Sequence, residues 1–164
     1  MAVLKIRTLA EPSLPDPILR QKAKPVNSVD SAIQKLIDDM VDTMLSASGA
    51  GLAATQVGQS LRIAVIGIPE EEILILINPV IVKREGSRIV EEACLSLPGY
   101  SGQIRRSAKV HVKALDRNSN EIKMVGEELL AQALEHEIDH LNGVLYTDKA
   151  IDVQRVDHLR SSQI

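Results

Sequence analysis

The middle of the chain consists of short runs rich in Val, Ile and Leu, separated by only a few Gly, Pro or charged residues. These runs cover residues 61–68, 73–82 and 88–91. Such residues favour strands, and connections this short cannot hold the helical crossover that parallel strands need. A further pair of segments, 109–116 and 121–125, flanks a polar turn and predicts a hairpin. The sequence therefore predicts mainly antiparallel sheets.

Two stretches with apolar residues three and four positions apart flank this strand-rich region, as amphipathic helices require. One spans residues 28–48, with Asn27 as a candidate N-cap and Gly49 as its stop. The other spans about 127–142 and ends at Gly143. The pattern predicts an α+β fold in which mainly antiparallel sheets pack around the helix near the C-terminus.

Composition limits the classes of protein that the chain can belong to. Its 164 residues are 45% apolar and 25% charged, which predicts one globular domain over residues 1–164. With two Tyr and no Phe or Trp, the core must be aliphatic, and bases have no aromatic platform on which to stack. The net charge of −3 also argues against DNA as a partner. The proline-rich segment 11–25 predicts an extended arm over the domain.

No segment predicts a membrane span or the apolar core of a signal peptide. The most apolar region, 73–82, is about half as long as the ~20 residues that a span requires, and Asn78 and Pro79 interrupt it. The N-terminal residues carry charges and then prolines rather than an unbroken apolar stretch. We therefore expect no membrane association and a cytoplasmic location.

The second helix contains the pattern HExxH, formed by His136, Glu137 and His140. At about 100° per residue the two histidines lie on one face, one turn apart, so both imidazoles can reach one metal ion. Glu137 falls on the apolar stripe of the helix, where a carboxylate is costly unless a cation and a polarised water compensate for its charge. The alternative is a helix whose histidines only pack or face solvent, which leaves the position of Glu137 unexplained.

A catalytic site of this kind has three protein ligands and a water, so one ligand must come from elsewhere. Tyr146 stands where the longer HExxHxxGxxH pattern has its third histidine, and Asp148, Asp152 and Asp157 offer carboxylates further on. Cys94, which we expect on a strand, is the single cysteine and cannot form an internal disulfide. A thiolate with two imidazoles would favour Fe(II), Zn(II), Ni(II) or Co(II) over Mg(II) or Ca(II).

A glycine-rich segment, 49–58, follows the first helix directly. Its glycines can simply end the helix and shape a turn, and the segment lacks the lysine of a phosphate-binding loop. A backbone with so few side chains can also lie against an extended peptide and pair with it like an added strand. The amide of Gln56 is then suited to holding a developing oxyanion.

Three segments together resemble the signature motifs of the peptide deformylases. Residues 49–56, 92–96 and 135–143 are similar, in order and separation, to GxGLAATQ, EGCLS and QHExDHLxG. The resemblance covers nearly the whole chain and implies a metallohydrolase that removes the N-formyl group from the formylmethionine of newly made peptides and releases formate. Two positions depart from the motifs, because Ala93 replaces a Gly and Glu135 replaces a Gln. Neither departure removes a ligand, so we expect activity.

The resemblance also implies a role for individual residues. Cys94, His136 and His140 would hold one divalent ion, expected to be Fe(II), with Zn(II), Ni(II) or Co(II) as alternatives. Glu137 would activate the metal-bound water and return its proton to the leaving amine. The developing oxyanion would be held by the metal, Gln56 and the backbone N–H of Leu95. Residues implied to line the peptide are Gly49, Ala50 and Gly51, and those implied to form the methionine pocket are Leu129, Ala133 and Ala50.

N-formylmethionyl nascent peptides are the expected partners, and the ribosome near its exit tunnel is a further candidate. The tail 151–164 balances Arg155 and Arg160 against acidic residues and has no basic face that would indicate ribosome binding. Two other functions fit HExxH in part. A metalloendopeptidase would need a groove that is open on both sides of the scissile bond. A paralogue that binds formyl peptides or metal without turnover is suggested by Ala93 and Glu135.

Overall fold

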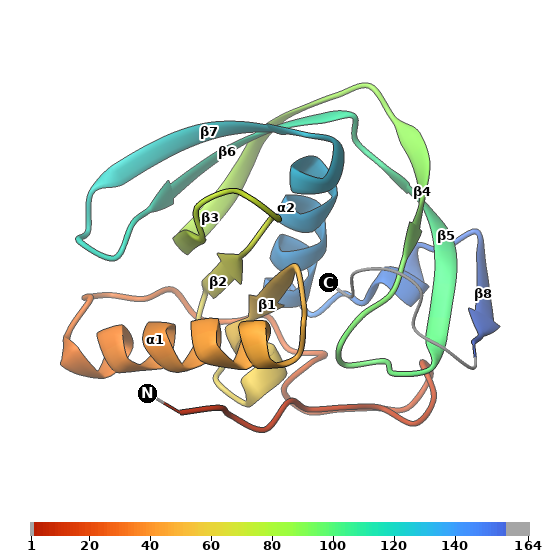
Figure 1. The fold of residues 1–164 in the computed structure, drawn as a ribbon, viewed down its shortest axis with the longest axis horizontal. Helices are drawn as coiled ribbons and strands as arrows, with labels where there is room; N and C mark the ends of the chain where they lie inside the picture. The colour runs from red at the N-terminus through yellow and green to blue at the C-terminus, as the bar shows by residue number, and fades with distance from the viewer. Residues whose placement is uncertain (1, 157–164) are drawn as a thin grey trace.

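The strands form two antiparallel sheets, as the short connections predict (Figure 1). The computed structural model describes residues 2–156. In this part of the chain a five-stranded sheet has the order β1-β2-β3-β6-β7, and a three-stranded sheet has the order β4-β5-β8. The strands of the larger sheet are β1 (Gly51–Ala53), β2 (Ile63–Ile66), β3 (Leu74–Glu85), β6 (Lys109–Leu115) and β7 (Glu121–Glu127). Those of the smaller sheet are β4 (Arg88–Glu92), β5 (Tyr100–Arg106) and β8 (Asp152–Arg155).

Both predicted helices are present, and the first is shorter than expected. It is α1 (Ser31–Ser46), and its N-cap is Asp30 rather than Asn27, because the Asp30 carboxylate accepts a hydrogen bond from the backbone N–H of Ile33. The second is α2 (Glu128–Leu141). Two short 3₁₀ helices, η1 (Ala54–Val57) and η2 (Tyr146–Asp148), complete the elements within the described residues.

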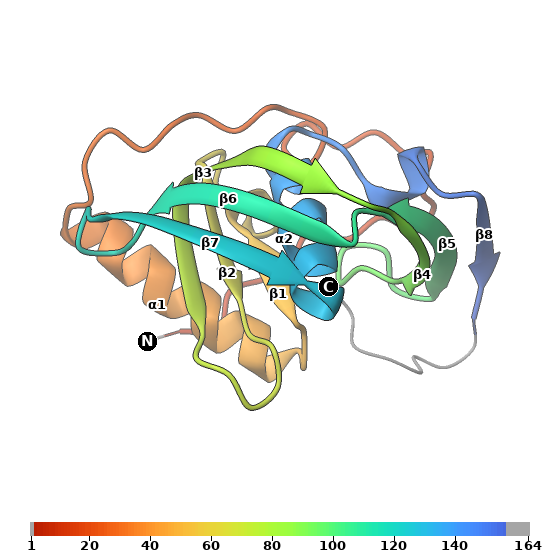
Figure 2. The same ribbon diagram turned by 90° about the horizontal axis from the view of Figure 1, so that it is seen from above.

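The helix α2 lies between the two sheets and is buried from residue 131 to residue 141 (Figure 1). Its apolar residues pack with aliphatic side chains of the larger sheet, among them Leu76, Val110 and Val112. In Figure 2, β3, β6 and β7 pass over this helix. A helix that is covered on all sides carries its polar residues into the interior, so the HExxH residues lie inside the protein.

Several strands extend beyond the predicted runs or were missed. The run 73–82 continues as β3 to Glu85, because Asn78 adopts a left-handed conformation beside an irregularity in the β3–β6 register instead of ending the strand. The strands β1, β5 and β8 were not predicted. Strand β5 is rich in Ser, Gly, Gln and Arg, which disfavour strands in isolation, and it is stabilised by pairing with β4 on one side and β8 on the other.

The proline-rich segment 11–25 does lie over the domain, but it is not extended. It forms turns at residues 12–13 and 17–20, and it buries Leu19 and Ala23. The carboxylate of Asp16 stabilises the second turn by accepting hydrogen bonds from the backbone N–H groups of Ile18 and Leu19. Among residues 2–156, no helix has both the length and the apolar character to span a membrane.

Candidate active site

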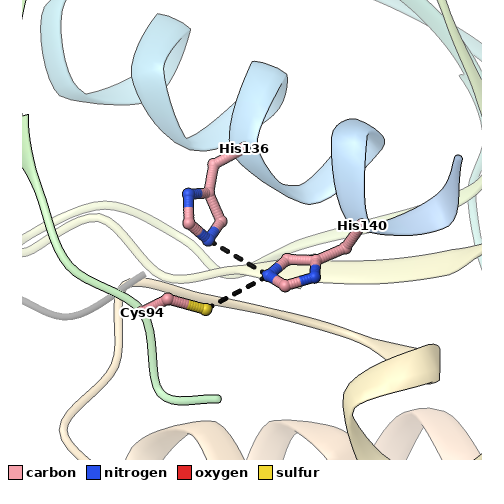
Figure 3. Close-up of side chains that lie close together, drawn as sticks. All are labelled: Cys94, His136 and His140. Atoms are coloured by element: carbon pink, nitrogen blue, oxygen red, sulfur yellow. Dashed lines mark hydrogen bonds between the residues drawn. The ribbon is translucent and has the colours of Figure 1, made fainter. Parts of the chain in front are cut away.

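Three buried donor side chains meet beneath α2 (Figure 3). The ligand atoms of Cys94, His136 and His140 all lie within 4.8 Å of one another. The Nε2 atom of His140 is 3.2 Å from Nε2 of His136 and 3.2 Å from Sγ of Cys94. Ligands of a tetrahedral zinc-like ion lie roughly 3.3–3.6 Å apart. The three atoms therefore fit three corners of a site for a borderline divalent ion.

Two separate elements bring these donors together. The histidines are one turn apart on α2, whereas Cys94 lies in the loop that follows β4. The expectation that Cys94 lies on a strand is wrong, because β4 ends at Glu92. Directly after the strand the chain turns, and the backbone N–H of Leu97 donates to the carbonyl of Cys94. This turn presents the thiol to the helix instead of to a neighbouring strand.

A buried ionic network holds the imidazole of His136. Its Nδ1 is 2.6 Å from Oε2 of Glu92. The same carboxylate accepts two hydrogen bonds from Arg106, one from Nη2 to Oε2 and one from Nε to Oε1. The remaining Nη1 of Arg106 donates to Asp139 at 2.8 Å. Burial raises the pKa of Glu92, but the charge of His136 and the bonds from Arg106 outweigh it and lower the pKa to about 2. The carboxylate is thus ionised and accepts from Nδ1–H, so Nε2 is the ring nitrogen that faces the other two donors.

Glu137 projects into a fully enclosed position beside these donors. Its side chain is 0% exposed, and neither carboxylate oxygen has a hydrogen-bond partner among residues 2–156. Burial raises its pKa from 4.5 to about 7. A carboxyl group with a pKa near neutrality exchanges a proton readily at physiological pH. The placement of Glu137 on an inward face is confirmed, and its environment suits a group that takes up and releases a proton.

The backbone of Gly51 explains how the carboxylate of Glu137 fits. A Cβ atom at Gly51 would lie 2.5 Å from Oε2 of Glu137, well inside van der Waals contact. Strand β1 therefore approaches α2 as closely as it does only because this residue has no side chain. The neighbouring predicted residues Gly49 and Ala50 lie immediately before β1.

Gln56 and Leu95 are the two residues predicted to hold the oxyanion. Gln56 precedes Cys94 by 38 positions and Leu95 follows it directly, and both are buried. The Oε1 atom of Gln56 accepts from the backbone N–H of Ala53 at 3.0 Å, so its Nε2 faces the other way. This Nε2 donates to Oγ of Ser96 at 3.1 Å and lies 3.7 Å from Sγ of Cys94. The backbone N–H of Leu95 makes no hydrogen bond within residues 2–156. The N–H of Leu95 is thus available to an additional acceptor, whereas the amide of Gln56 contacts Ser96 and Cys94.

The residues predicted to receive a peptide also lie together. Strand β1 is at the edge of the larger sheet, so one side of its backbone has no partner strand within residues 2–156, which is the position where an extended peptide can add. Ala50 and Ala133 belong to the apolar cluster formed by α2 and the larger sheet, and Leu129 packs against it. An apolar side chain that entered here would contact aliphatic groups.

The other candidates for the third ligand do not join the group. Tyr146 is buried and stacks on His136 with ring centroids 6.1 Å apart, and it offers no thiol, imidazole or carboxylate. Asp148 forms an ion pair with Arg20 at 2.6 Å, and Asp152 accepts a hydrogen bond from the backbone of β5. Asp157 lies outside the described residues, as does Arg160 of the tail.

Sequence reasoning missed the three residues that support His136. Glu92 and Asp139 belong to the motif segments themselves, and Arg106 lies on an unpredicted strand. The sequence did contain a signal for them. Glu92 and Asp139 lie within two positions of the predicted ligands Cys94 and His140, and a buried carboxylate needs a cationic partner. The partner could not be identified from sequence, because Arg106 meets Glu92 and Asp139 only through the pairing of β5 with β4 and the packing of α2.

The two departures from the family motifs are accommodated without disturbing the donors. The methyl group of Ala93 is buried directly after β4. The carboxylate of Glu135 accepts hydrogen bonds from the backbone N–H and Oγ of Ser107 and from Nε of Arg84 at 2.7, 2.9 and 2.9 Å. It therefore points to the corner between β5 and β6 and has its charge compensated there.

An enclosed carboxylate, three metal-type donors and an HExxH helix between antiparallel sheets define a metallohydrolase. Comparison with known proteins identifies which kind. Residues 12–156 match the family model described as "Polypeptide deformylase". The chain belongs to this family and is a peptide-deformylase-type hydrolase.

Individual relatives cover most of the chain. The peptide deformylase of Dehalococcoides mccartyi (strain CBDB1) is 53% identical over 146 residues, which are 88% of this chain and 86% of the relative. That of Halothermothrix orenii (strain H 168) is 49% identical over 93% of this chain and 97% of the relative. The crystal structure of a peptide deformylase from Legionella pneumophila has a TM-score of 0.85 at 48% identity, covering 90% of this chain and 86% of that one. The Ehrlichia chaffeensis enzyme in complex with actinonin has a TM-score of 0.86 at 40% identity, covering 91% and 89%.

Proposed function

We propose that this protein hydrolyses the N-formyl group of peptides that begin with formylmethionine, releasing formate and a free amino terminus. The observation that carries the proposal is the enclosed, unpartnered carboxylate of Glu137 next to Cys94, His136 and His140. Such a group has no structural partner among the described residues and would be costly to bury without a function.

Substrate binding is assigned to the edge of β1 and the apolar cluster behind it. An extended peptide can add to the free edge at Gly49, Ala50 and Gly51 through main-chain hydrogen bonds. The methionine side chain would then lie against Leu129, Ala133 and Ala50. The formyl group is small, since only a hydrogen lies beyond the carbon that is attacked, so a narrow site is sufficient for it.

Cys94, His136 and His140 would hold one divalent ion, which supplies Lewis-acid polarisation of the attacking water and of the formyl oxygen. Glu137 accepts a proton from that water on a carboxylate oxygen as the new C–O bond forms. Gln56 Nε2 and the Leu95 N–H donate to the oxygen that gains charge, and each such donor contributes about 3 kcal/mol to lowering the barrier. The C–N bond then breaks, Glu137 returns the proton to the amine nitrogen, and formate leaves.

The decisive assay is formate release from formyl-Met-Ala-Ser by protein loaded with Fe(II) without oxygen. We expect turnover by the natural chain and a loss of about 10²- to 10⁴-fold in kcat for Glu137→Gln with metal content unchanged. Glu135→Gln is the matched control, because its carboxylate faces Ser107 and not the donors. Near-normal turnover by Glu137→Gln would remove the proposed role of this residue.

The same assay separates the two alternative functions. A metalloendopeptidase would cleave an internal bond of an N-acetylated peptide, which mass spectrometry detects, and Cys94→Ala would keep full metal affinity. A binding paralogue would retain formyl-Met-Ala-Ser and release no formate.

The proposal also covers the identity of the metal ion and the place in the cell where the protein acts. Fe(II) is the expected ion, with Zn(II), Ni(II) and Co(II) as alternatives that suit one sulfur and two nitrogen ligands. Metal analysis of protein purified without oxygen tests this choice. The expected substrates are nascent chains in the cytoplasm near the ribosome exit tunnel, and the complex of the Ehrlichia chaffeensis relative suggests actinonin as a competitor for their site.

A further inference from the structure

The first residues of the chain form an outer segment, 2–10, that we name the N-terminal strap. It runs beside α1 and then below η1 (Figure 1). Two hydrogen bonds to side chains attach its beginning to α1, because the N–H of Ala2 donates to Oδ1 of Asp39 and the N–H of Leu4 donates to Oγ1 of Thr43, both at 2.8 Å. At its other end the hydroxyl of Tyr100 donates to the carbonyl of Ala10 at 3.1 Å.

Between these ends the strap contacts both halves of the candidate oxyanion site. The N–H of Arg7 donates to the backbone carbonyl of Gln56 at 2.7 Å, and the N–H of Leu9 donates to that of Ser96 at 2.8 Å. Gln56 lies in η1, which directly follows β1 of the larger sheet. Ser96 lies in the loop after β4 of the smaller sheet. Two residues of the strap therefore join segments that are forty positions apart.

Apolar side chains of the strap also contact both donor segments. The side chain of Ile6 packs against the cluster that contains Ala54 and Leu95. The side chain of Leu9 is 5% exposed and belongs to the cluster that contains Cys94 and Leu97. The strap is thus packed into the two cores on either side of the site and is not a loose surface segment.

We propose that the N-terminal strap is a positioning element for the two oxyanion donors, an inference that rests on the proposed function. The direct link between the donor segments is Nε2 of Gln56, which contacts Oγ of Ser96 and Sγ of Cys94. That same amide must turn its hydrogens to the reacting oxygen, so it cannot be the only contact that sets the spacing. The main-chain bonds from Arg7 and Leu9 hold the spacing independently, and donors of this kind must be held within about 0.5 Å to be effective.

Proline substitution tests the bond from Arg7, because proline has no N–H. We expect Arg7→Pro to lower kcat for formyl-Met-Ala-Ser by about 10- to 100-fold, since misplacement by an ångström has such effects. KM should change by less than about twofold, since the peptide-binding edge of β1 is untouched.

Two variants serve as controls. Arg7→Ala removes the same guanidinium and keeps the N–H, and Thr8→Pro adds a proline where the N–H makes no bond within residues 2–156. Both controls should stay within about twofold of the natural chain in kcat. Equal kcat for Arg7→Pro and Arg7→Ala would overturn the proposal.

A double-mutant cycle distinguishes positioning from general weakening of the fold. If the strap acts through Gln56, Arg7→Pro should cost less than about threefold in a Gln56→Ala background. The same loss in both backgrounds would mean that the strap does not act on this donor, and the proposal would be wrong. Should Arg7→Pro fail to fold, Tyr100→Phe removes only the bond to Ala10. It should lower kcat by about two- to fivefold with an unchanged thermal midpoint, and an unchanged kcat overturns the proposal.

Hydrogen exchange provides a readout that does not depend on turnover. Peptides covering 54–58 and 94–98 should exchange faster in Arg7→Pro than in Thr8→Pro, because the strap no longer protects them. Equal exchange in the two variants contradicts the proposal. If the natural chain releases no formate, the proposed function fails, while the exchange result still decides whether the strap holds these segments.

Discussion

Glu92 and His136 form a fully buried pair in which Nδ1 of the imidazole lies 2.6 Å from the carboxylate, on the side of the ring opposite the nitrogen that faces Cys94 and His140. This contact engages Nδ1 and fixes the plane of the ring, so that Nε2 is the nitrogen presented to an ion. Glu92→Gln keeps the size of the side chain but removes its charge and disturbs the bonds from Arg106. We expect metal affinity to fall by about 10- to 100-fold, measured by competition with a chelator.

Glu91→Gln is the matched control for this prediction. Its side chain is exposed on the opposite face of β4, and its carbonyl, which accepts a bond from Gln132, is unchanged by the substitution. Equal affinities for the two variants would show that the buried carboxylate does not support the ligand.

Gly51→Ala should impair catalysis far more than stability. The added Cβ would lie 2.5 Å from Oε2 of Glu137, and the carboxylate is the movable end of a side chain, so it shifts while the fold persists. We expect kcat to fall by about 10- to 100-fold. Gly86→Ala gives the reverse pattern, since its φ of +65° lies in the turn between β3 and β4, far along the chain from the site. It should cost about 1–2 kcal/mol of unfolding free energy and leave kcat unchanged.

The turn at Asp16 predicts a pH-dependent contribution to stability. Burial raises the pKa of Asp16, but the N–H of Leu19, the Arg7 guanidinium and the N–H of Ile18 outweigh it and hold the pKa below its ordinary value. A carboxyl group of this kind stabilises the fold above its unfolded pKa of about 3.9 and loses that contribution as the pH falls through its folded pKa. Asp16→Asn should cost about 1–2 kcal/mol at neutral pH.

The sign of this dependence provides the test. The difference in unfolding free energy between the natural chain and Asp16→Asn should shrink as the pH is lowered from about 6 to about 3. Urea titrations at each pH measure it. A difference that stays constant over this range would show that the charge of Asp16 is not involved.

Glu135→Gln restores the residue of the family motif and should have little effect. Glutamine keeps a carbonyl oxygen for the N–H of Ser107, and its amide can donate to the Ser107 hydroxyl that now donates to the carboxylate. The ion pair with Arg84, whose side chain is 55% exposed, is lost. Pairs of this exposure contribute about 0–1 kcal/mol, so the unfolding free energy should fall by less than about 1 kcal/mol. Formate release should stay within about twofold of the natural chain. A larger change in rate would show that the charge of Glu135 reaches the site.

Local patterns predicted the elements whose residues interact with near neighbours in the chain. The helix with HExxH, the hairpin at 109–116 and 121–125, and the inward face of Glu137 all follow from a fixed periodicity, and the structure has each of them. Strands β1, β5 and β8 were missed because small or polar residues form strands only when a partner strand is already present. The prediction of a single domain over 1–164 stays a prediction.

The sequence by itself determined that two histidines and a glutamate would share one turn of a helix, because that relationship depends only on helical geometry. It also determined that the strands would be antiparallel, because their connections are short. The three motifs together predicted that Cys94 joins the histidines, which the spacing of residues alone left open. Only the tertiary structure decided that Glu92 and Arg106 support one histidine and that the N-terminal strap reaches both donor segments. Those contacts link residues on different elements of the chain, and they form only when strand pairing and packing bring these elements together.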